Sequence, residues 1–309
     1  MDNFTVINQV VILFMLMAVG FYAEKKDIIN YELSKGLSDI LINIALPALI
    51  ISSFTFKFSK DMLENAGIVI IFSLFIHTIV ILLSRLAFKN YAFNKRNVLN
   101  YFAVFPNAAF MGLPFIFAIY GQTGVFYASI FLVPNQVLMW TYGQGMFLKE
   151  AGEQLKLKPF LTKLKNPAIL GVAIGLIIFI LSIKLPYTID KTLTILGGIT
   201  LPLAMMIVGE KIAKVRLKDI FSDKDVYYGS FVRLIIVPIM TFVFLRIFNV
   251  NPLIINVCVA VEVLPAATTV VILSQQYGGD SVFASKCALI SHLLSIITIP
   301  IMIIFLKVI

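Results

Sequence analysis

The chain has 309 residues, of which 60% are hydrophobic and only 13% are charged, and its mean hydropathy is +0.98. One soluble core cannot bury so much apolar surface, so the composition predicts an all-α protein that crosses a membrane several times. A net charge of +9 can indicate nucleic-acid binding, but the basic residues lie in short loops between apolar segments, which argues against a nucleic-acid partner.

Ten apolar segments follow one another along the chain, and about 20 residues suffice to span a bilayer core. They cover residues 5–23, 36–54, 66–88, 98–120, 124–147, 167–184, 190–210, 226–248, 253–275 and 282–307. The first segment follows MDNF and lacks both a basic leader and a cleavage site, so we expect it to be a retained helix.

The distribution of basic residues predicts the orientation of these segments. When residues near a segment end are counted with the adjoining loop, 17 of the 25 lysines and arginines fall in the loops after odd-numbered segments. Six fall in the even-numbered loops and at the termini, and Arg233 and Lys286 lie within segments. Because cytoplasmic loops carry an excess of lysine and arginine, the odd-numbered loops are expected in the cytoplasm. We therefore expect a multi-pass protein of the plasma membrane with both termini outside.

Three short similarities between the two halves of the chain predict an internal repeat. VFPNAA at 104–109 resembles VLPAAT at 263–268, and YGQTGVFYAS at 120–129 resembles YGGDSVFAS at 277–285. ALPALII at 45–51 also resembles TLPLAMM at 200–206. The matched segments are five apart, an odd number, so the second half must enter the bilayer from the opposite side. Such inverted repeats are common in secondary transporters.

The expected organisation is thus a five-plus-five inverted repeat. Residues 1–148 form the first repeat, 149–166 a basic cytoplasmic linker, and 167–309 the second repeat.

Pro106 and Pro265 occupy matching places in the fourth and ninth segments, and they predict two broken helices. Proline removes a backbone N–H group, and within lipid the freed carbonyls have no water to bind, so such breaks persist only inside protein or beside a wet cavity. Half-helix N-termini there would attract an anion such as a carboxylate. Asn107 supplies an amide, and Thr268 and Thr269 supply hydroxyls. A lone proline indicates only a kink, but a repeat-matched pair favours a substrate site.

The same residues resemble a known family. VFPNAAFMGLPFIFAIYG at 104–121 resembles the PNT-x-x-MG-x-P segment of the plant PIN-type auxin exporters. Leu264-Pro265, followed by small and hydroxyl residues, Gln276-Tyr277-Gly278 and Asp280, resembles bacterial members of the auxin efflux carrier family.

The resemblance implies a ten-helix fold similar to bile-acid symporters and sodium–proton antiporters. Helices 1, 2, 6 and 7 would form a scaffold, which could also join a homodimer. Helices 3–5 and 8–10 would form a transport domain, in which helices 4 and 9 cross at Pro106 and Pro265. The resemblance also implies that Asn107 contacts a substrate carboxylate. Plant members have a second proline where this chain has Val270, and a long insert where it has a short basic loop. Malate- and malonate-like anions are therefore closer models than auxin.

Polar residues inside apolar segments are costly and hence candidates for function. Glu262 is expected to couple transport to a proton or sodium ion, or to pair with Arg233 or Lys286. Two roles are expected for Arg233. Its guanidinium either neutralises Glu262 or an anionic substrate, or it extends toward the membrane interface. Further candidates for substrate or helix contacts are the amides Asn135, Gln136 and Asn43. His77 and His292 are expected to be helix-packing donors, and two histidines with two cysteines are too few for a metal site.

Our first hypothesis is a secondary transporter that moves a small organic anion by elevator-type alternating access. The alternative is a sodium- or proton-coupled transporter of a neutral or zwitterionic solute, with Glu262 as the coupling site. A membrane sensor would bind its ligand without flux. The sequence contains no GxxxxGK[ST] motif, so direct use of ATP is not expected. It also lacks a plausible nucleophile–base pair, HExxH motif or aspartate pair, so an enzyme is not expected.

Overall fold

The structure is a computed structural model, and it describes residues 3–152, 166–214, 223–248 and 250–308. Residues 153–165 of the predicted linker lie outside the described residues. Over the described ranges the chain is helical, and the extended pairing there is a single β-bridge between Pro106 and Ala266.

Six described helices are long and apolar enough to cross a membrane, which makes this a multi-pass helical membrane protein. They are Glu32–Ser52, Lys60–Ala87, Leu113–Glu150, Tyr187–Ala213, Lys224–Ile247 and Ser281–Phe305. Two shorter apolar helices are Pro167–Ile180 and Pro252–Glu262. The full count of ten spans and their inverted repeat stay predictions.

The chain forms two compact units. The first comprises Met1–Val69, Ala108–Phe131 and Lys165–Val215, and the second Ile70–Asn107, Leu132–Leu164 and Arg216–Ile309. The first unit contains the four helices predicted as the scaffold, together with 66–69 and 108–131, which the prediction placed in the transport domain. The functional division into scaffold and transport domain stays a prediction.

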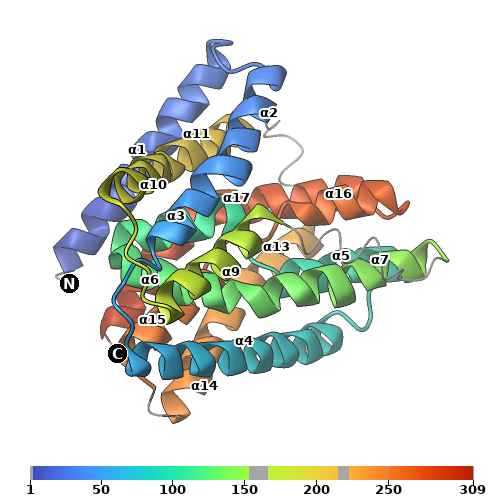
Figure 1. The fold of residues 1–309 in the computed structure, drawn as a ribbon. Coiled ribbons are helices and arrows are strands. Elements are labelled where there is room, and N and C mark those ends of the chain that lie inside the picture. The colour runs from blue at the N-terminus through green and yellow to red at the C-terminus, as the bar shows by residue number, and fades with distance from the viewer. Residues whose placement is uncertain (1–2, 153–165, 215–222, 249, 309) are drawn as a thin grey trace. The chain divides into compact units, whose positions relative to one another are not determined.

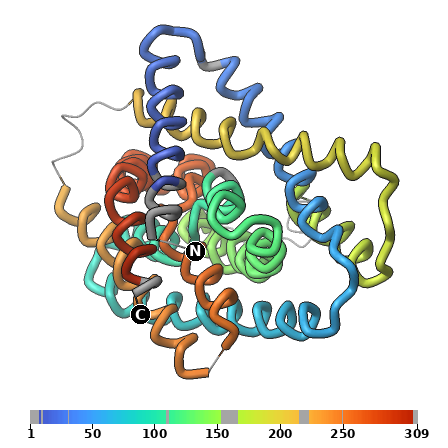
Figure 2. Tube along the Cα trace, turned by 90° about the vertical axis from the view of Figure 1, so that its left-hand side faces the viewer, coloured from blue at the N-terminus to red at the C-terminus, as the bar shows by residue number. Residues whose placement is uncertain are grey.

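In the first unit, glycines allow helices to pack closely. Its helices are α1 (Asn3–Lys25), α2 (Tyr31–Ile40), η1 (Leu41–Ala45), α3 (Leu46–Ser52), the start of α4 (Lys60–Ala87), η2 (Ala108–Gly112), the start of α6 (Leu113–Leu138), α9 (Pro167–Ile180), α10 (Tyr187–Gly198) and α11 (Thr200–Ala213). Helix α11 lies against α1 (Figures 1 and 2). A Cβ on Gly20 would collide with the Met206 backbone, and one on Gly209 with the Met17 backbone. Small residues at such contacts are typical of membrane helices.

Two local signals define helix limits in this unit. The Asn30 side chain accepts a hydrogen bond of 2.9 Å from the Leu33 N–H group, so helix α2 begins at Tyr31, five residues before the predicted start at 36. Gly121 has φ +62° and ψ −157° within α6, a backbone conformation that residues other than glycine rarely adopt. It lies in the predicted gap between segments 98–120 and 124–147.

The second unit holds the rest of α4 (Lys60–Ala87) and α6, together with α5 (Phe93–Val104), η3 (Met139–Gly143), α7 (Gln144–Glu150), α13 (Lys224–Phe231), η4 (Val232–Ile236), α14 (Val237–Ile247), α15 (Pro252–Glu262), α16 (Thr269–Gln276) and α17 (Ser281–Val308). Helix α17, red in Figure 2, packs against α5, α13, η4 and α16. Helix α14 packs against α15. These contacts bring both helix breaks into one core.

Candidate functional site at two paired helix breaks

The backbone is interrupted at both predicted prolines. Helix α5 ends at Val104 and η2 begins at Ala108, while α15 ends at Glu262 and α16 begins at Thr269. Phe105 between the first pair has extended backbone angles of φ −107° and ψ 112°. The predicted breaks at Pro106 and Pro265 are therefore present in the structure.

The two breaks bind each other through their main chains. The Asn107 N–H group donates to the Pro265 carbonyl at 2.8 Å, and the Ala267 N–H group donates to the Phe105 carbonyl at 2.9 Å. These bonds form the antiparallel bridge between Pro106 and Ala266. An unsatisfied backbone group within a membrane costs several kcal/mol. Each break therefore supplies hydrogen-bond partners for backbone groups that the other break leaves outside a helix. Proline is tolerated at the bridge since it has no N–H group to satisfy.

Arg233 on η4 connects both breaks. Its Nη1 donates to the Ala103 carbonyl at 3.0 Å, and its Nε donates to the Leu264 carbonyl at 3.1 Å. Nη1 also donates to Glu262 Oε2 at 2.9 Å. The ends of α5 and α15 carry partial negative charge, which the guanidinium complements. The Arg233 side chain is 0% exposed, so the alternative in which it extends to the membrane interface is wrong. Lys286 is half-buried on α17, and the partner of Glu262 is Arg233.

Glu262 is also close to a histidine–asparagine pair. Its second oxygen, Oε1, lies 3.9 Å from His77 Nε2 and has no hydrogen-bond partner among the described residues. His77 Nδ1 lies 2.6 Å from the Ser73 carbonyl, which can only accept, so Nδ1 carries the hydrogen. Nε2 then accepts from Asn135 Nδ2 at 2.7 Å. The predicted site amide Asn135 is thus held by a neutral histidine.

Asn107 is held in the same way. Its Nδ2 lies 2.9 Å from His292 Nε2, and His292 Nδ1 lies 2.6 Å from the Ala288 carbonyl on its own helix. Asn107 and His292 are both buried. The sequence analysis predicted Asn107 as a ligand group but missed its partner. The one signal available was that His292 lies within an apolar segment, and that signal does not identify what it contacts.

Comparison with known proteins agrees with the transport interpretation. Residues 5–303 match the membrane transport protein family. The chain belongs to this family. The membrane transport protein family is the same family as the auxin efflux carriers that the sequence resembles. Members of this family are transporters rather than enzymes. An uncharacterized transporter of Methanocaldococcus jannaschii is 25% identical over 305 residues, which are 94% of this chain and 96% of the relative.

The other predicted site residues of this membrane transport protein differ in their surroundings. Thr268 and Thr269 are half-buried where α16 begins. Gln136 is buried, and its Oε1 atom has no hydrogen-bond partner among the described residues. Asn43 belongs to the first unit, is exposed, and donates to the Asp39 carbonyl of its own helix at 2.9 Å. Direct substrate contact by these four side chains stays a prediction.

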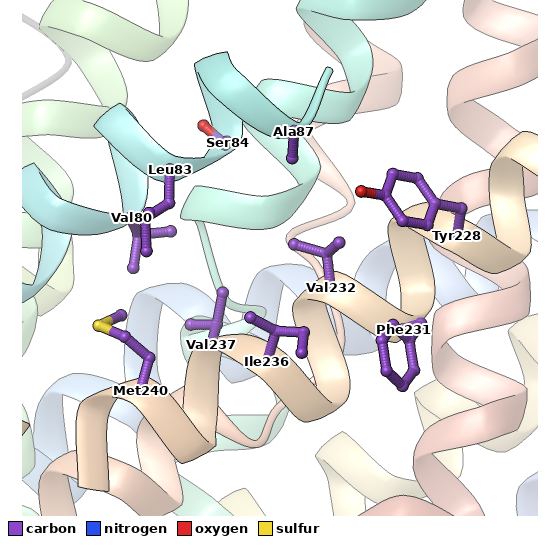
Figure 3. A pocket seen from close by; sticks show the side chains of 10 residues that line it. All are labelled: Val80, Leu83, Ser84, Ala87, Tyr228, Phe231, Val232, Ile236, Val237 and Met240. Carbon is purple, nitrogen blue, oxygen red and sulfur yellow. The ribbon is translucent and has the colours of Figure 1, made fainter. Parts of the chain in front are cut away.

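An apolar cavity of about 260 Å³ lies elsewhere in the second unit, between α4 and the α13–η4–α14 segment (Figure 3). Of the ten side chains that line it, only Ser84 and Tyr228 carry polar atoms. The Ser84 hydroxyl already donates to the Ile81 carbonyl at 3.0 Å. This cavity contains none of the break residues and offers no set of donors to a carboxylate, so it does not compete with the breaks as an anion site.

Proposed function

We propose that this membrane transport protein is a secondary transporter that carries a small organic anion, of the malate or malonate type, across the plasma membrane. The substrate binds beside the paired breaks at Pro106 and Pro265. The observation that carries this proposal is the direct bridge between the two breaks, which holds the buried Asn107 amide at the junction. Paired discontinuous helices are where transporters of inverted-repeat construction place their substrates.

The charge balance at the breaks supports an anionic substrate. A lone carboxylate at Glu262 would repel an anion. Arg233 lies 2.9 Å from it and forms a buried pair with no net charge. Asn107 can then contribute amide hydrogens without a competing negative charge. The N-terminus of α16, with Thr268 and Thr269 beside it, adds partial positive charge on the second repeat.

The proposed mechanism is alternating access of the elevator type. The transport domain, helices 3–5 and 8–10, moves against the scaffold of helices 1, 2, 6 and 7. The four helices of the proposed scaffold fall together in one compact unit, which supports their acting as one body. The hydrogen-bonded bridge between the breaks supports their movement together with the substrate.

Counterflow of labelled malonate or malate into proteoliposomes tests this function. Asn107→Ala removes an amide that is proposed to bind a charged group, and substrate binding should weaken about ten- to hundredfold. Asn251→Ser is the matched control, since Asn251 caps α15 through the Leu253 N–H group and serine preserves such a cap. Absence of carboxylate flux in the wild-type protein, or unchanged affinity in Asn107→Ala, would contradict the proposal.

A second candidate function is sodium- or proton-coupled transport of a neutral or zwitterionic solute. It is favoured by Glu262 Oε1, a buried carboxylate oxygen without a hydrogen-bond partner in the described part of the chain. This function predicts uptake of a zwitterionic amino acid that requires a sodium or pH gradient and loses that requirement in Glu262→Gln. Intact coupling in Glu262→Gln would rule out the role of Glu262. Carboxylate counterflow without either gradient would favour the first function.

A further inference from the structure

We propose that His292 is the proton-binding group of this transporter, and that it couples a proton to carboxylate binding by reversing the Asn107 amide. The inference rests on the proposed function, because it takes a carboxylate at Asn107 as the substrate. It concerns a different side chain from Glu262 and a proton that travels in the same direction as the anion.

The hydrogen bonds of His292 define its neutral state. A backbone carbonyl only accepts hydrogen bonds, so the 2.6 Å contact with the Ala288 carbonyl places the hydrogen on Nδ1. Nε2 is then the acceptor, and the atom of Asn107 that faces it must be the donor Nδ2, at 2.9 Å. In this state one amide hydrogen of Asn107 is bound to the ring. The side of the amide that faces away from the ring carries Oδ1, which only accepts hydrogen bonds.

Protonation of Nε2 reverses this arrangement. The new N–H bond turns Nε2 into a donor, and a donor cannot face Nδ2. A half-turn of the Asn107 amide brings Oδ1 to the ring and releases both hydrogens of Nδ2. The ring also becomes a cation. A carboxylate is an acceptor with negative charge, so it gains from the released donor and from the charge. The proton comes from water on the side from which the anion enters, and it returns to water when the anion leaves.

The predicted repeat indicates why this device occurs in one half only. Ser129 and Ser285 align in the matched segments 120–129 and 277–285. Seven residues further on lie Gln136 in the first half and His292 in the second. Both side chains are buried. Glutamine offers an amide that does not titrate, whereas histidine offers a group that gains a proton near neutral pH. The second half alone can therefore change its charge at this position.

The ionisable neighbours of α17 do not replace His292 in this role. The elements of the second unit that pack against α17 are α5, α13, η4 and α16, and α16 contains no ionisable side chain. Arg233 pairs with Glu262, and Lys95 pairs with Asp223 and Asp225. The remaining ionisable groups on these elements and on α17 itself are Arg96, Tyr101, Lys224, Tyr227, Tyr228, Lys286, Cys287 and Lys307. Histidine is the one side-chain type whose unperturbed charge change falls between about pH 5 and 8.

The test measures proton uptake and affinity in the full-length wild-type protein in detergent. Malonate is added in weak buffer with a pH indicator, and its dissociation constant is measured from about pH 6.5 to about pH 8.5, where its carboxyls stay ionised. We expect uptake approaching one proton per malonate and an affinity that weakens by up to about tenfold per pH unit as pH rises. Binding without proton uptake and without pH dependence would overturn the inference while leaving the proposed function intact. Absence of malonate and malate binding at every pH would overturn both.

His292→Gln identifies the group. Glutamine can still bond Asn107 but cannot take up a proton, so malonate should bind with an affinity that no longer varies with pH and without proton uptake. His77→Gln is the matched variant, because His77 holds Asn135 by the same pair of bonds and lies 3.9 Å from Glu262. If His77→Gln loses the pH dependence and His292→Gln retains it, the proton resides at His77 and the inference is wrong. Since the wild-type measurement needs no variant, a misfolded His292→Gln protein does not remove the test.

Discussion

The Arg233 guanidinium and the Glu262 carboxylate form an ion pair of 2.9 Å, with side chains that are 0% and 1% exposed. The same guanidinium bonds the Ala103 and Leu264 carbonyls, so one cation holds an acidic side chain and both helix breaks. Removing one partner of a buried pair leaves an uncompensated charge, whereas replacing both partners by apolar groups is often tolerated.

Arg233→Met should therefore lower the free energy of unfolding by about 3–5 kcal/mol. Glu262→Gln should cost less, because the guanidinium keeps its bonds to the two carbonyls and can still donate to the glutamine oxygen. Thermal unfolding in detergent measures both. Glu64→Gln is the control, since the Lys60–Glu64 pair is 82% and 62% exposed and such pairs contribute at most about 1 kcal/mol. Equal losses in all three variants would contradict the coupling role of Arg233.

Gly20 and Met206 test the close contact between α1 and α11. A Cβ at Gly20 would overlap the Met206 backbone, which cannot move without separating the helices. We expect Gly20→Ala to destabilise the protein by about 1–3 kcal/mol, as overpacking does elsewhere. Gly67→Ala on α4 is the control, because a methyl group at this position would meet nothing within 4 Å and alanine favours a helix by about 1 kcal/mol. A Gly20→Ala protein as stable as the Gly67→Ala protein would show that α1 and α11 are not in this contact.

The sequence predicted the breaks but not what holds them. Pro106 and Pro265 could be found because proline leaves a local signal and the two halves of the chain repeat it. The partners of the breaks are distant: Arg233 is 130 residues from Ala103, and His292 is 185 residues from Asn107. Hydropathy identifies each segment as a helix, but it does not specify which faces of non-adjacent helices meet. For the same reason two explanations of Arg233 remained open until its contacts were known.

Helix limits were predicted less well where polar side chains cap the helix. The polar residues of YELSKG at 31–36 lower the local hydropathy, so the predicted segment began at residue 36. The Asn30 cap and the acidic first turn stabilise that end of the helix, and they act through hydrogen bonding and charge rather than through apolar surface.

Gly121 should be needed for its backbone conformation. Its φ of +62° with ψ of −157° lies in a region that is essentially restricted to glycine, although nothing lies within 4 Å of a Cβ built there. Gly121→Ala should thus cost about 1–3 kcal/mol through backbone strain alone. Gly145→Ala on α7 is the control, because its methyl group would also meet nothing within 4 Å and its φ is not positive. Similar stability of the two variants, measured by thermal unfolding, would contradict the strained turn.

Lys95, which precedes the predicted segment 98–120, should give the stability a dependence on alkaline pH. Its Nζ lies 2.9 Å from Asp225 Oδ2 and 3.2 Å from Asp223 Oδ2. The hydrogen bond to Asp225 raises the pKa of Lys95 above its ordinary value of 10.5, against a smaller opposite effect of burial. Because the folded pKa is the higher one, the stabilisation is complete below the unfolded-state pKa and is lost as pH rises through the folded-state value.

Lys95→Gln should consequently be less stable than the wild type near neutral pH, by no more than about 1 kcal/mol because the pair is partly exposed. The difference between the two proteins should shrink as pH rises above 10.5, and also in about 1 M salt, which screens exposed charges. Unfolding of both proteins across this pH range measures it. A difference that is constant from neutral to strongly alkaline pH would assign the effect of Lys95 to packing of its aliphatic chain. It would rule out the charge of Nζ, which acts on the two aspartates and on the Phe283 ring centroid 4.8 Å away.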